Sequence, residues 1–289
     1  HIPDEHDGAV MKKMREEIES NLKKILIFMF FFYNFFLSTS FIAQAAEEEL
    51  LQVSGEHFVA YYLDDEQFAR DVLRRAEYYY NKIADELGYD RYSKFWTWEY
   101  RVKIMIFPDR QSYIDATGTS SWSEGMADYL KKEISSYVWS EGFLDALLPH
   151  EIAHLIFRDF VGFKGEVPLW LDEGVAQWME PEKRTEVMDI MYQIMQEEKA
   201  MPLDEMMQLD IKEEEDNERV YIFYVESASL VGFLIKEYGS KKFMEFCRHL
   251  RDGKNLKSAL TFTYPTKIRD IKQLEEQWAG YVIKEGQTR

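Results

Sequence analysis

The sequence predicts an α+β fold, because candidate strands come early in the chain and helices come late. Segment 100–109 alternates towards a strand and stops at Pro108. Segment 133–139 is a second short strand by its β-branched and aromatic content. After residue 142, most of the chain carries apolar residues at helical spacing. The two kinds of element are therefore segregated along the chain.

The helices are recognised by their apolar faces and their ends. Segment 64–88 begins with acidic residues and ends at Gly88, and segment 142–162 ends at Gly162. Pro149 either starts a regular helix at its first turn or kinks a longer one. Further elements are expected after these: helices over 168–180 and 181–201, an acidic connection over 203–218, and three or four helices over 219–286, broken at Gly239, Gly253 and Pro265.

The first 45 residues are expected to lie outside the fold. Segment 11–24 carries five basic residues, an uncharged run follows over 25–37, and Ala43, Gln44 and Ala45 form a small-x-small sequence. This order is typical of a secretory signal peptide cleaved after Ala45 or Ala46. An uncleaved membrane anchor is the alternative, because residues 25–43 make a stretch of nineteen residues and a membrane span needs roughly 20. Either way, the chain is expected to work outside the cytoplasm, extracellularly or in the cell envelope.

The remaining residues, 46–289, are expected to form a single catalytic-sized domain, with a helical C-terminal portion over about 182–289. The chain is 46% hydrophobic and 16% aromatic, which suffices for a sizeable core. Its formal charge of −18 argues against nucleic acid as a partner. The single cysteine, Cys247, follows the helical spacing of its apolar neighbours, so we expect core packing. A lone cysteine excludes an intrachain disulfide and a Cys-rich metal cluster.

The stretch LLPHEIAHLIF, residues 147–157, contains a candidate metal site. Residues four apart on a helix lie about 40° apart in projection, so His150 and His154 point to the same side. Zinc suits two neutral imidazoles. Glu151 is displaced by about 100°, so it is placed to reach a water on the metal rather than to act as a ligand. Such a motif arises by chance in about one or two of a hundred chains like this one.

A hydrolytic zinc site needs a third protein ligand, and Glu173 is the candidate. Eighteen residues separate it from His154, enough for a helix end, a turn and a second helix. Small residues follow Glu173, so its helix can pack close to the first. Histidine ligands usually donate their second N–H to an acceptor, and Asp172 and Glu180 are candidates for that role.

The motif HExxH followed after eighteen residues by WLDEGVAQWME resembles the gluzincin zinc peptidases and is similar to the aminopeptidase N-like enzymes. As a shorter chain that is expected to be exported, the protein most resembles the peptidase MA-like family. The resemblance covers roughly residues 55–240, and its specific part is 149–180. It implies a small mixed sheet in the N-terminal part, a helical C-terminal part and an active-site helix between them. It also implies one zinc ion per chain and a peptide or protein substrate.

Three further expectations come from this resemblance. The aminopeptidase-like enzymes carry an oxyanion-binding tyrosine in a Tyr-x-Lys-Gly-Ala sequence, and YVESA places Tyr224 in its position, with Tyr221 as the fallback. Glu226 and Ser227 replace the lysine and glycine, and a packed aromatic in a helix core is the other interpretation of either tyrosine. No segment resembles the one that anchors a free amine in aminopeptidases. The strand over 133–139 is expected to be the edge that pairs with a peptide, or an ordinary solvent-covered edge.

These observations predict an exported zinc metallopeptidase in which His150, His154 and Glu173 bind the ion, Glu151 is the general base and Tyr224 supports the oxyanion. Two alternatives stay open. One is a catalytically silent, zinc-containing cell-surface binding module of the same fold. The other is a helix-rich interaction protein without metal, whose histidines are satisfied by acidic neighbours.

Overall fold

A mixed five-stranded sheet forms the N-terminal part of the computed structural model, which describes residues 50–88, 96–119, 123–138, 142–162, 167–211 and 213–288. The strand order is β1-β2-β3-β5-β4. The central pairs, β2 with β3 and β3 with β5, are parallel, and the outer pairs are antiparallel. The strands are β1 (Leu51–Ser54), β2 (Phe58–Tyr62), β3 (Val102–Phe107), β4 (Gly125–Asp128) and β5 (Glu133–Tyr137).

The edge of the sheet differs from the prediction. Strand β5 corresponds to the predicted segment 133–139, but it lies between β3 and β4, so the expectation that it forms a free edge is wrong. On this side of the sheet the edge strand is β4, with the sequence GMAD, and β1 is the edge strand on the other side. Glycine, alanine and aspartate are all depleted in strands, so nothing in the local sequence indicated an edge strand here.

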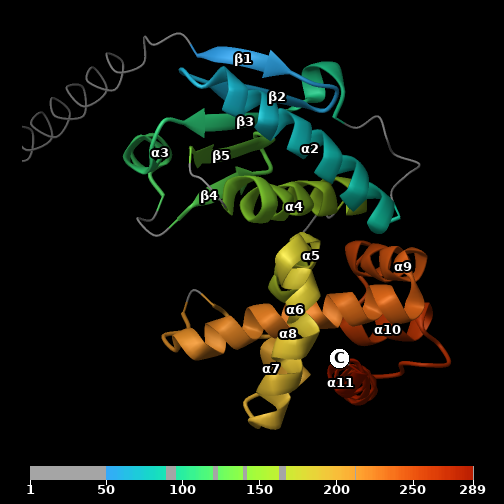
Figure 1. Ribbon diagram of the computed structural model, residues 1–289. Coiled ribbons are helices and arrows are strands. Elements are labelled where there is room, and N and C mark those ends of the chain that lie inside the picture. Colours follow the sequence, from blue (N-terminus) through green and yellow to red (C-terminus); the bar gives the residue numbers. More distant parts are fainter. Residues whose placement is uncertain are drawn as a thin grey trace, which may run out of the picture. The chain divides into compact units, whose positions relative to one another are not determined.

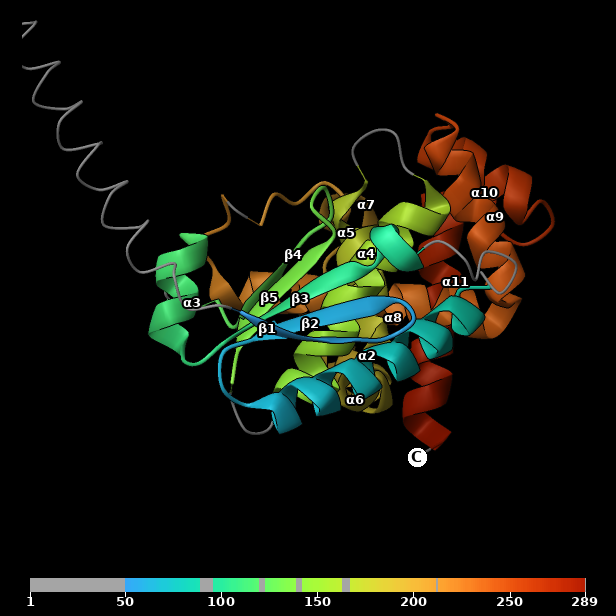
Figure 2. The same ribbon diagram turned by 90° about the horizontal axis from the view of Figure 1, so that it is seen from above.

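Helices α2 (Glu66–Glu86) and α4 (Leu148–Val161) pack beside the sheet, as Figure 2 shows. Helix α2 lies against β1 and β2, and it begins at Asp65, whose side chain accepts a hydrogen bond from the backbone N–H of Phe68. Helix α4 contacts α2 and β4. A short 3-10 turn, η2 (Trp98–Tyr100), precedes β3, and α3 (Arg110–Thr117) follows it.

Helix α4 (Leu148–Val161) carries the HExxH motif, and a wider π-helical turn, η3 (Phe143–Leu147), runs directly into it. Pro149 occupies the first turn of α4, where its missing N–H is tolerated. The helix ends at Gly162 with a left-handed φ of 68°. Both possibilities for Pro149 are thus partly realised, because the α-helix starts beside it and an irregular helical turn precedes it.

The C-terminal part is helical, and in Figure 1 helix α5 crosses α8. In the described range 213–288, four helices follow residue 216, with breaks at Gly239, at Gly253 and around Pro265, so the larger predicted number is confirmed. Helix α6 ends five residues before its predicted end. The helices are α5 (Leu169–Met179), α6 (Pro181–Gln196), α7 (Leu203–Met206), α8 (Asn217–Tyr238), α9 (Ser240–Arg251), α10 (Leu256–Thr263) and α11 (Ile271–Thr288).

The class is α+β, as predicted, and residues 51–289 make one compact unit. Cys247 is fully buried, which confirms the core packing expected for it. The candidate signal peptide or anchor, 1–45, lies outside the described residues. Within the part of the chain that is described, no helix has the length and apolar character needed to cross a membrane.

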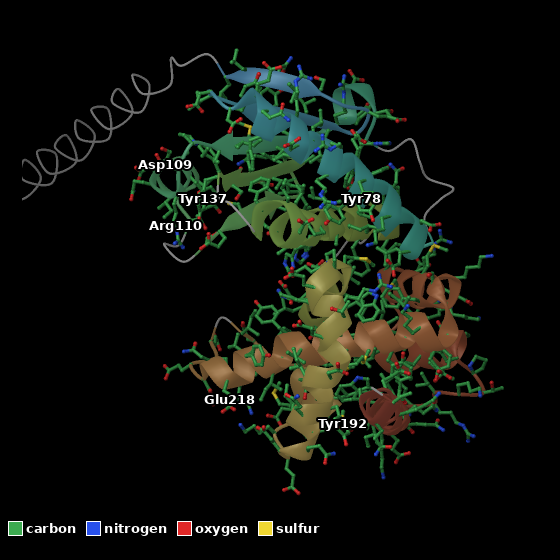
Figure 3. The ribbon with its side chains drawn as sticks, viewed as in Figure 1. Tyr78, Asp109, Arg110, Tyr137, Tyr192 and Glu218 are labelled. Carbon is green, nitrogen blue, oxygen red and sulfur yellow. The ribbon has the colours of Figure 1, made fainter. Side chains whose placement is uncertain are left out.

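The edge strand is fixed at the α3 end of the sheet, where Tyr137 and Arg110 lie (Figure 3). Glu124, just before β4, accepts a hydrogen bond from the Tyr137 hydroxyl and lies 2.9 Å from Nη2 of Arg110. The backbone carbonyl of Glu124 accepts from the Ser136 hydroxyl at 2.6 Å. These contacts hold the start of β4 beside β5.

Candidate metal centre

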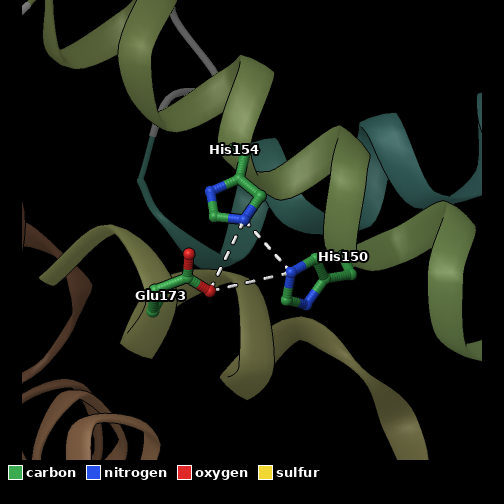
Figure 4. A group of neighbouring side chains, drawn as sticks. All are labelled: His150, His154 and Glu173. Carbon is green, nitrogen blue, oxygen red and sulfur yellow. Dashed lines mark hydrogen bonds and ion pairs between the residues drawn. The ribbon is translucent and has the colours of Figure 1, made fainter. Parts of the chain in front are cut away.

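Three potential metal ligands from two helices converge, as Figure 4 shows. Helix α4 supplies His150 and His154, and α5 supplies Glu173. The Nε2 atoms of the two histidines lie 3.1 Å apart. Oε2 of Glu173 lies 3.9 Å from each of them. All three ligand atoms fall within 4.8 Å of one another, so one ion could contact all of them.

The other ring nitrogen of each histidine faces a carboxylate. Nδ1 of His150 lies 2.8 Å from Oε1 of Glu180, and Nδ1 of His154 lies 3.1 Å from Oδ1 of Asp172. A carboxylate at Nδ1 favours the proton there and leaves the Nε2 lone pair free to bind a metal. The two residues named as candidate acceptors from the sequence are both in place, one for each histidine.

Each of these carboxylates has a cation behind it. Nζ of Lys183 lies 2.8 Å from Oε1 of Glu180, and Nη2 of Arg158 lies 2.7 Å from Oδ2 of Asp172. Asp172 and Glu180 are both buried, and polar groups in such surroundings need partners to offset the cost of burial. Two chains of cation, carboxylate and imidazole therefore lead to the ligand atoms.

The electrostatics of the site follow from burial and these partners. Burial opposes ionisation of Asp172, but His154 and Arg158 outweigh it and hold the pKa of that carboxyl below its ordinary value. For His154, burial acts to lower the pKa, whereas Asp172 and the neighbouring glutamates raise it to about 9. Burial raises the pKa of Glu173 against the attraction of the two histidines. The carboxylates around His154 thus favour positive charge at this position.

A cleft of about 400 Å³ opens over the three ligand atoms. Glu151 is 8% exposed and lines it together with the ligands. Tyr224 of α8 also lines the cleft, whereas Tyr221 is exposed and does not. Burial, and then the charge of Glu173, raise the pKa of Tyr224 to about 12. The cleft is lined by Gly125, Met126, Ala127, Tyr129, His150, Glu151, His154, Leu155, Arg158, Asp172, Glu173 and Tyr224.

Comparison with known families matches the model for the peptidase MA superfamily to residues 102–284, which run from β3 into α11. The chain belongs to the peptidase MA superfamily. Its membership indicates a peptidase-like domain, and the matched range includes every residue that lines the cleft. Among curated proteins, no significant match to this chain is found.

Within this superfamily domain, Gly174 explains how Tyr224 comes to face Glu173. A Cβ on Gly174 would lie 2.5 Å from the backbone oxygen of Ser227, so only glycine lets α5 approach α8 this closely. The small residue therefore serves the contact with α8, although the sequence suggested the contact with the first helix.

The departure from the aminopeptidase-like Tyr-x-Lys-Gly-Ala sequence lies away from the cleft. Glu226 is fully buried, and its Oε1 accepts a hydrogen bond from the backbone N–H of Met201 at 2.7 Å. Residues two apart on a helix point about 200° apart, so Glu226 and Tyr224 face different sides. The replacement thus changes how α8 packs on the chain before α7.

Two functional candidates were missed from the sequence alone. Strand β4 lines the cleft but carries no strand-like residues, so it gave no signal. Arg158 also lines the cleft. Its spacing did give a signal in the sequence, because Arg158 follows His154 by four residues, as His154 follows His150. The same helical periodicity that selected the histidines could have found it.

Proposed function

We propose that this chain is a zinc-dependent peptidase that hydrolyses peptide bonds with Glu151 as general base. The observation that carries the proposal is the convergence of the His150, His154 and Glu173 ligand atoms beneath a cleft that Glu151 also lines. Membership of the peptidase MA superfamily supports the reaction class.

The donor set fits zinc. Two imidazole nitrogens and one carboxylate oxygen leave a fourth position of a tetrahedral site open, as catalytic zinc requires. The Nδ1 contacts to Glu180 and Asp172 orient both rings so that Nε2 faces the centre. When bound, the ion would polarise the scissile carbonyl and lower the pKa of the attacking water.

Glu151 and Tyr224 would handle the proton and the developing charge. Glu151 would accept the proton of the attacking water and pass it to the leaving nitrogen. The Tyr224 hydroxyl stays protonated at neutral pH, since its pKa is raised to about 12 by burial and the charge of Glu173. It can therefore donate a hydrogen bond to the oxyanion of the tetrahedral intermediate.

The substrate would bind as an extended chain along β4. This strand is an edge of the sheet and lines the cleft through Gly125, Met126 and Ala127. An exposed strand edge offers backbone N–H and C=O groups to a peptide in an antiparallel or parallel pairing.

The deciding experiment compares the wild-type protein with Glu151→Gln on a mixed peptide library, after the zinc content of both has been measured. We expect about one zinc per chain in both proteins and cleavage products from the wild type alone. Zinc in both proteins with no products from either would favour the catalytically silent binding module. Equal activity in both would contradict the role of Glu151 as general base. Absence of zinc from the wild-type protein would refute the proposal that this chain is a zinc-dependent peptidase.

We also propose export of the domain formed by residues 46–289. The support is the order of charged, apolar and small residues over 11–45. Intact-mass analysis of the protein made in a secreting host would show a mature N-terminus at residue 46 or 47. A full-length protein retained in the membrane fraction would instead indicate an anchor.

A further inference from the structure

Arg158 presents a partly exposed cation to the cleft. It lies on α4 at the same four-residue spacing as His150 and His154, so all three side chains project on one side of the helix. Its side chain is 28% exposed and lines the cleft over the ligand atoms. It is the sole lysine or arginine among the described lining residues.

One edge of the Arg158 guanidinium donates hydrogen bonds to Asp172, and another edge has no such contact. Its Nε and Nη2 atoms donate to Oδ2 of Asp172, at 3.2 and 2.7 Å. The guanidinium carbon lies 4.6 Å from the centre of the Tyr129 ring, which helps to fix the orientation of the group. Within the described part of the chain, Nη1 has no acceptor. A guanidinium has five N–H donors, so the free edge can bind a further carboxylate.

The cations behind the two orienting carboxylates differ in their access to the cleft. Lys183 lies 2.8 Å from Glu180 in the chain leading to His150, and neither of these two residues lines the cleft. Arg158 and Asp172 both line it. Of the two cations, Arg158 is therefore the one that a substrate in the cleft can reach.

The charge of the cleft makes this position selective. Glu151, Asp172 and Glu173 line the same cleft, and Arg158 is the side chain among the described lining residues whose guanidinium attracts an acidic group of a substrate. Arg158 is linked through Asp172 to His154, which places its guanidinium within about 10 Å of the ligand atoms, a span of roughly two or three extended residues.

We propose that Arg158 binds a carboxylate of the substrate two or three residues from the scissile bond, a specificity that rests on the proposed peptidase function. The carboxylate comes either from the C-terminus of a peptide or from an aspartate or glutamate side chain. In the first case the enzyme removes short C-terminal fragments. In the second case it cleaves near acidic residues within a chain.

Binding to the zinc-loaded Glu151→Gln protein tests this without cleavage. The probe is a library of N-acetylated decapeptides in free-acid and amide forms, with bound peptides quantified by mass spectrometry. Preference for free acids identifies the C-terminus, and enrichment of aspartate or glutamate at one position in both forms identifies a side chain. We expect a preference of about tenfold, the scale of one charge-assisted contact. No preference for either carboxylate would overturn the proposal.

Two further substitutions in the Glu151→Gln background separate recognition from support of the site. Arg158→Gln should abolish the carboxylate preference, and Arg158→Lys should retain part of it. Lys183→Gln is the matched control, because it removes the cation behind Glu180 and leaves the cleft charge intact. An equal preference in Arg158→Gln would overturn the proposal. Since binding is measured, failure of wild-type cleavage would count against the peptidase function and not against this contact.

Discussion

Oε1 of Glu180 lies 2.8 Å from Nδ1 of His150, although the two residues are thirty positions apart in the chain. Asp172 makes the corresponding contact with His154 at 3.1 Å. Helix α5 and the residue that ends it therefore supply one candidate ligand, Glu173, and both orienting carboxylates. The packing of α5 against α4 therefore places the third ligand and both orienting carboxylates relative to the two histidines.

Removing either orienting carboxylate should weaken metal binding while keeping the three ligands. We expect Glu180→Gln and Asp172→Asn each to reduce zinc affinity by about 10- to 100-fold, because the imidazole loses its orientation and basicity. Competition with a chromogenic chelator measures the affinity. The exposed Glu182→Gln serves as control, and wild-type affinity in both buried variants would contradict the assigned contacts.

Zinc should stabilise the wild-type fold through its ligands. A ligand that binds only the folded state at 100 times its Kd adds about 2.7 kcal/mol of stability, so a chelator should lower the Tm of the wild-type protein. In His154→Ala the same chelator should cause little change, since the site is incomplete. Equal shifts in both proteins would place the metal elsewhere. Thermal unfolding with and without chelator makes the comparison.

Tyr224→Phe should slow cleavage without affecting zinc. Loss of one oxyanion donor commonly costs on the order of 100-fold in kcat, and the phenyl ring keeps the packing of α8. Tyr221→Phe is the matched control one turn away, where the side chain is exposed. Steady-state kinetics on a cleaved peptide decides between them. A similar loss in both variants would assign the effect to α8 as a whole.

Gly174→Ala should destabilise the fold, because the added Cβ would meet the backbone oxygen of Ser227 at 2.5 Å. Overpacking of this kind costs about 1–3 kcal/mol. Gly280→Ala in α11 provides the control, since its Cβ would meet nothing within 4 Å and alanine favours a helix. Urea unfolding of the two variants should move the midpoint in opposite directions. A neutral Gly174→Ala would contradict the close approach of α5 and α8.

Glu226 should make stability fall as the pH rises. Burial raises its pKa to about 8 from an ordinary 4.5, so between these values the folded protein keeps a proton that the unfolded chain releases. The free energy of unfolding therefore decreases as pH increases from about 5 to about 8. Glu226→Gln lacks this loss and can still accept from the Met201 N–H. Its stability relative to wild type should grow by about a few kcal/mol over that range.

Unfolding curves at pH 5, 7 and 9 measure the effect of Glu226. The exposed Glu237→Gln on the same helix should run parallel to the wild type at every pH. If the stability of Glu226→Gln also ran parallel to that of the wild type at every pH, the Glu226 carboxyl of the wild type would be ionised in the folded protein.

The sequence by itself determined most of the helices, two of the strands and the ligand types. Helical periodicity placed His150 and His154 on one face of α4, because the four-residue spacing is a property of the helix alone. The glycines that end helices are equally local, so the breaks between the C-terminal helices could be predicted, with three or four helices expected. These features depend on neighbours within a turn or two.

Tertiary structure decided the features that depend on pairing between distant segments. The edge position of β4 follows from the order of strands in the sheet, which no local propensity encodes. Which carboxylate orients which histidine follows from the crossing of α4 and α5, and Gly174 sets the distance from α5 to α8. The free edge of Arg158 exists because Asp172 meets only one side of its guanidinium. Packing between distant segments therefore determined the geometry of the candidate site residues, whereas the local sequence could only identify them as candidates.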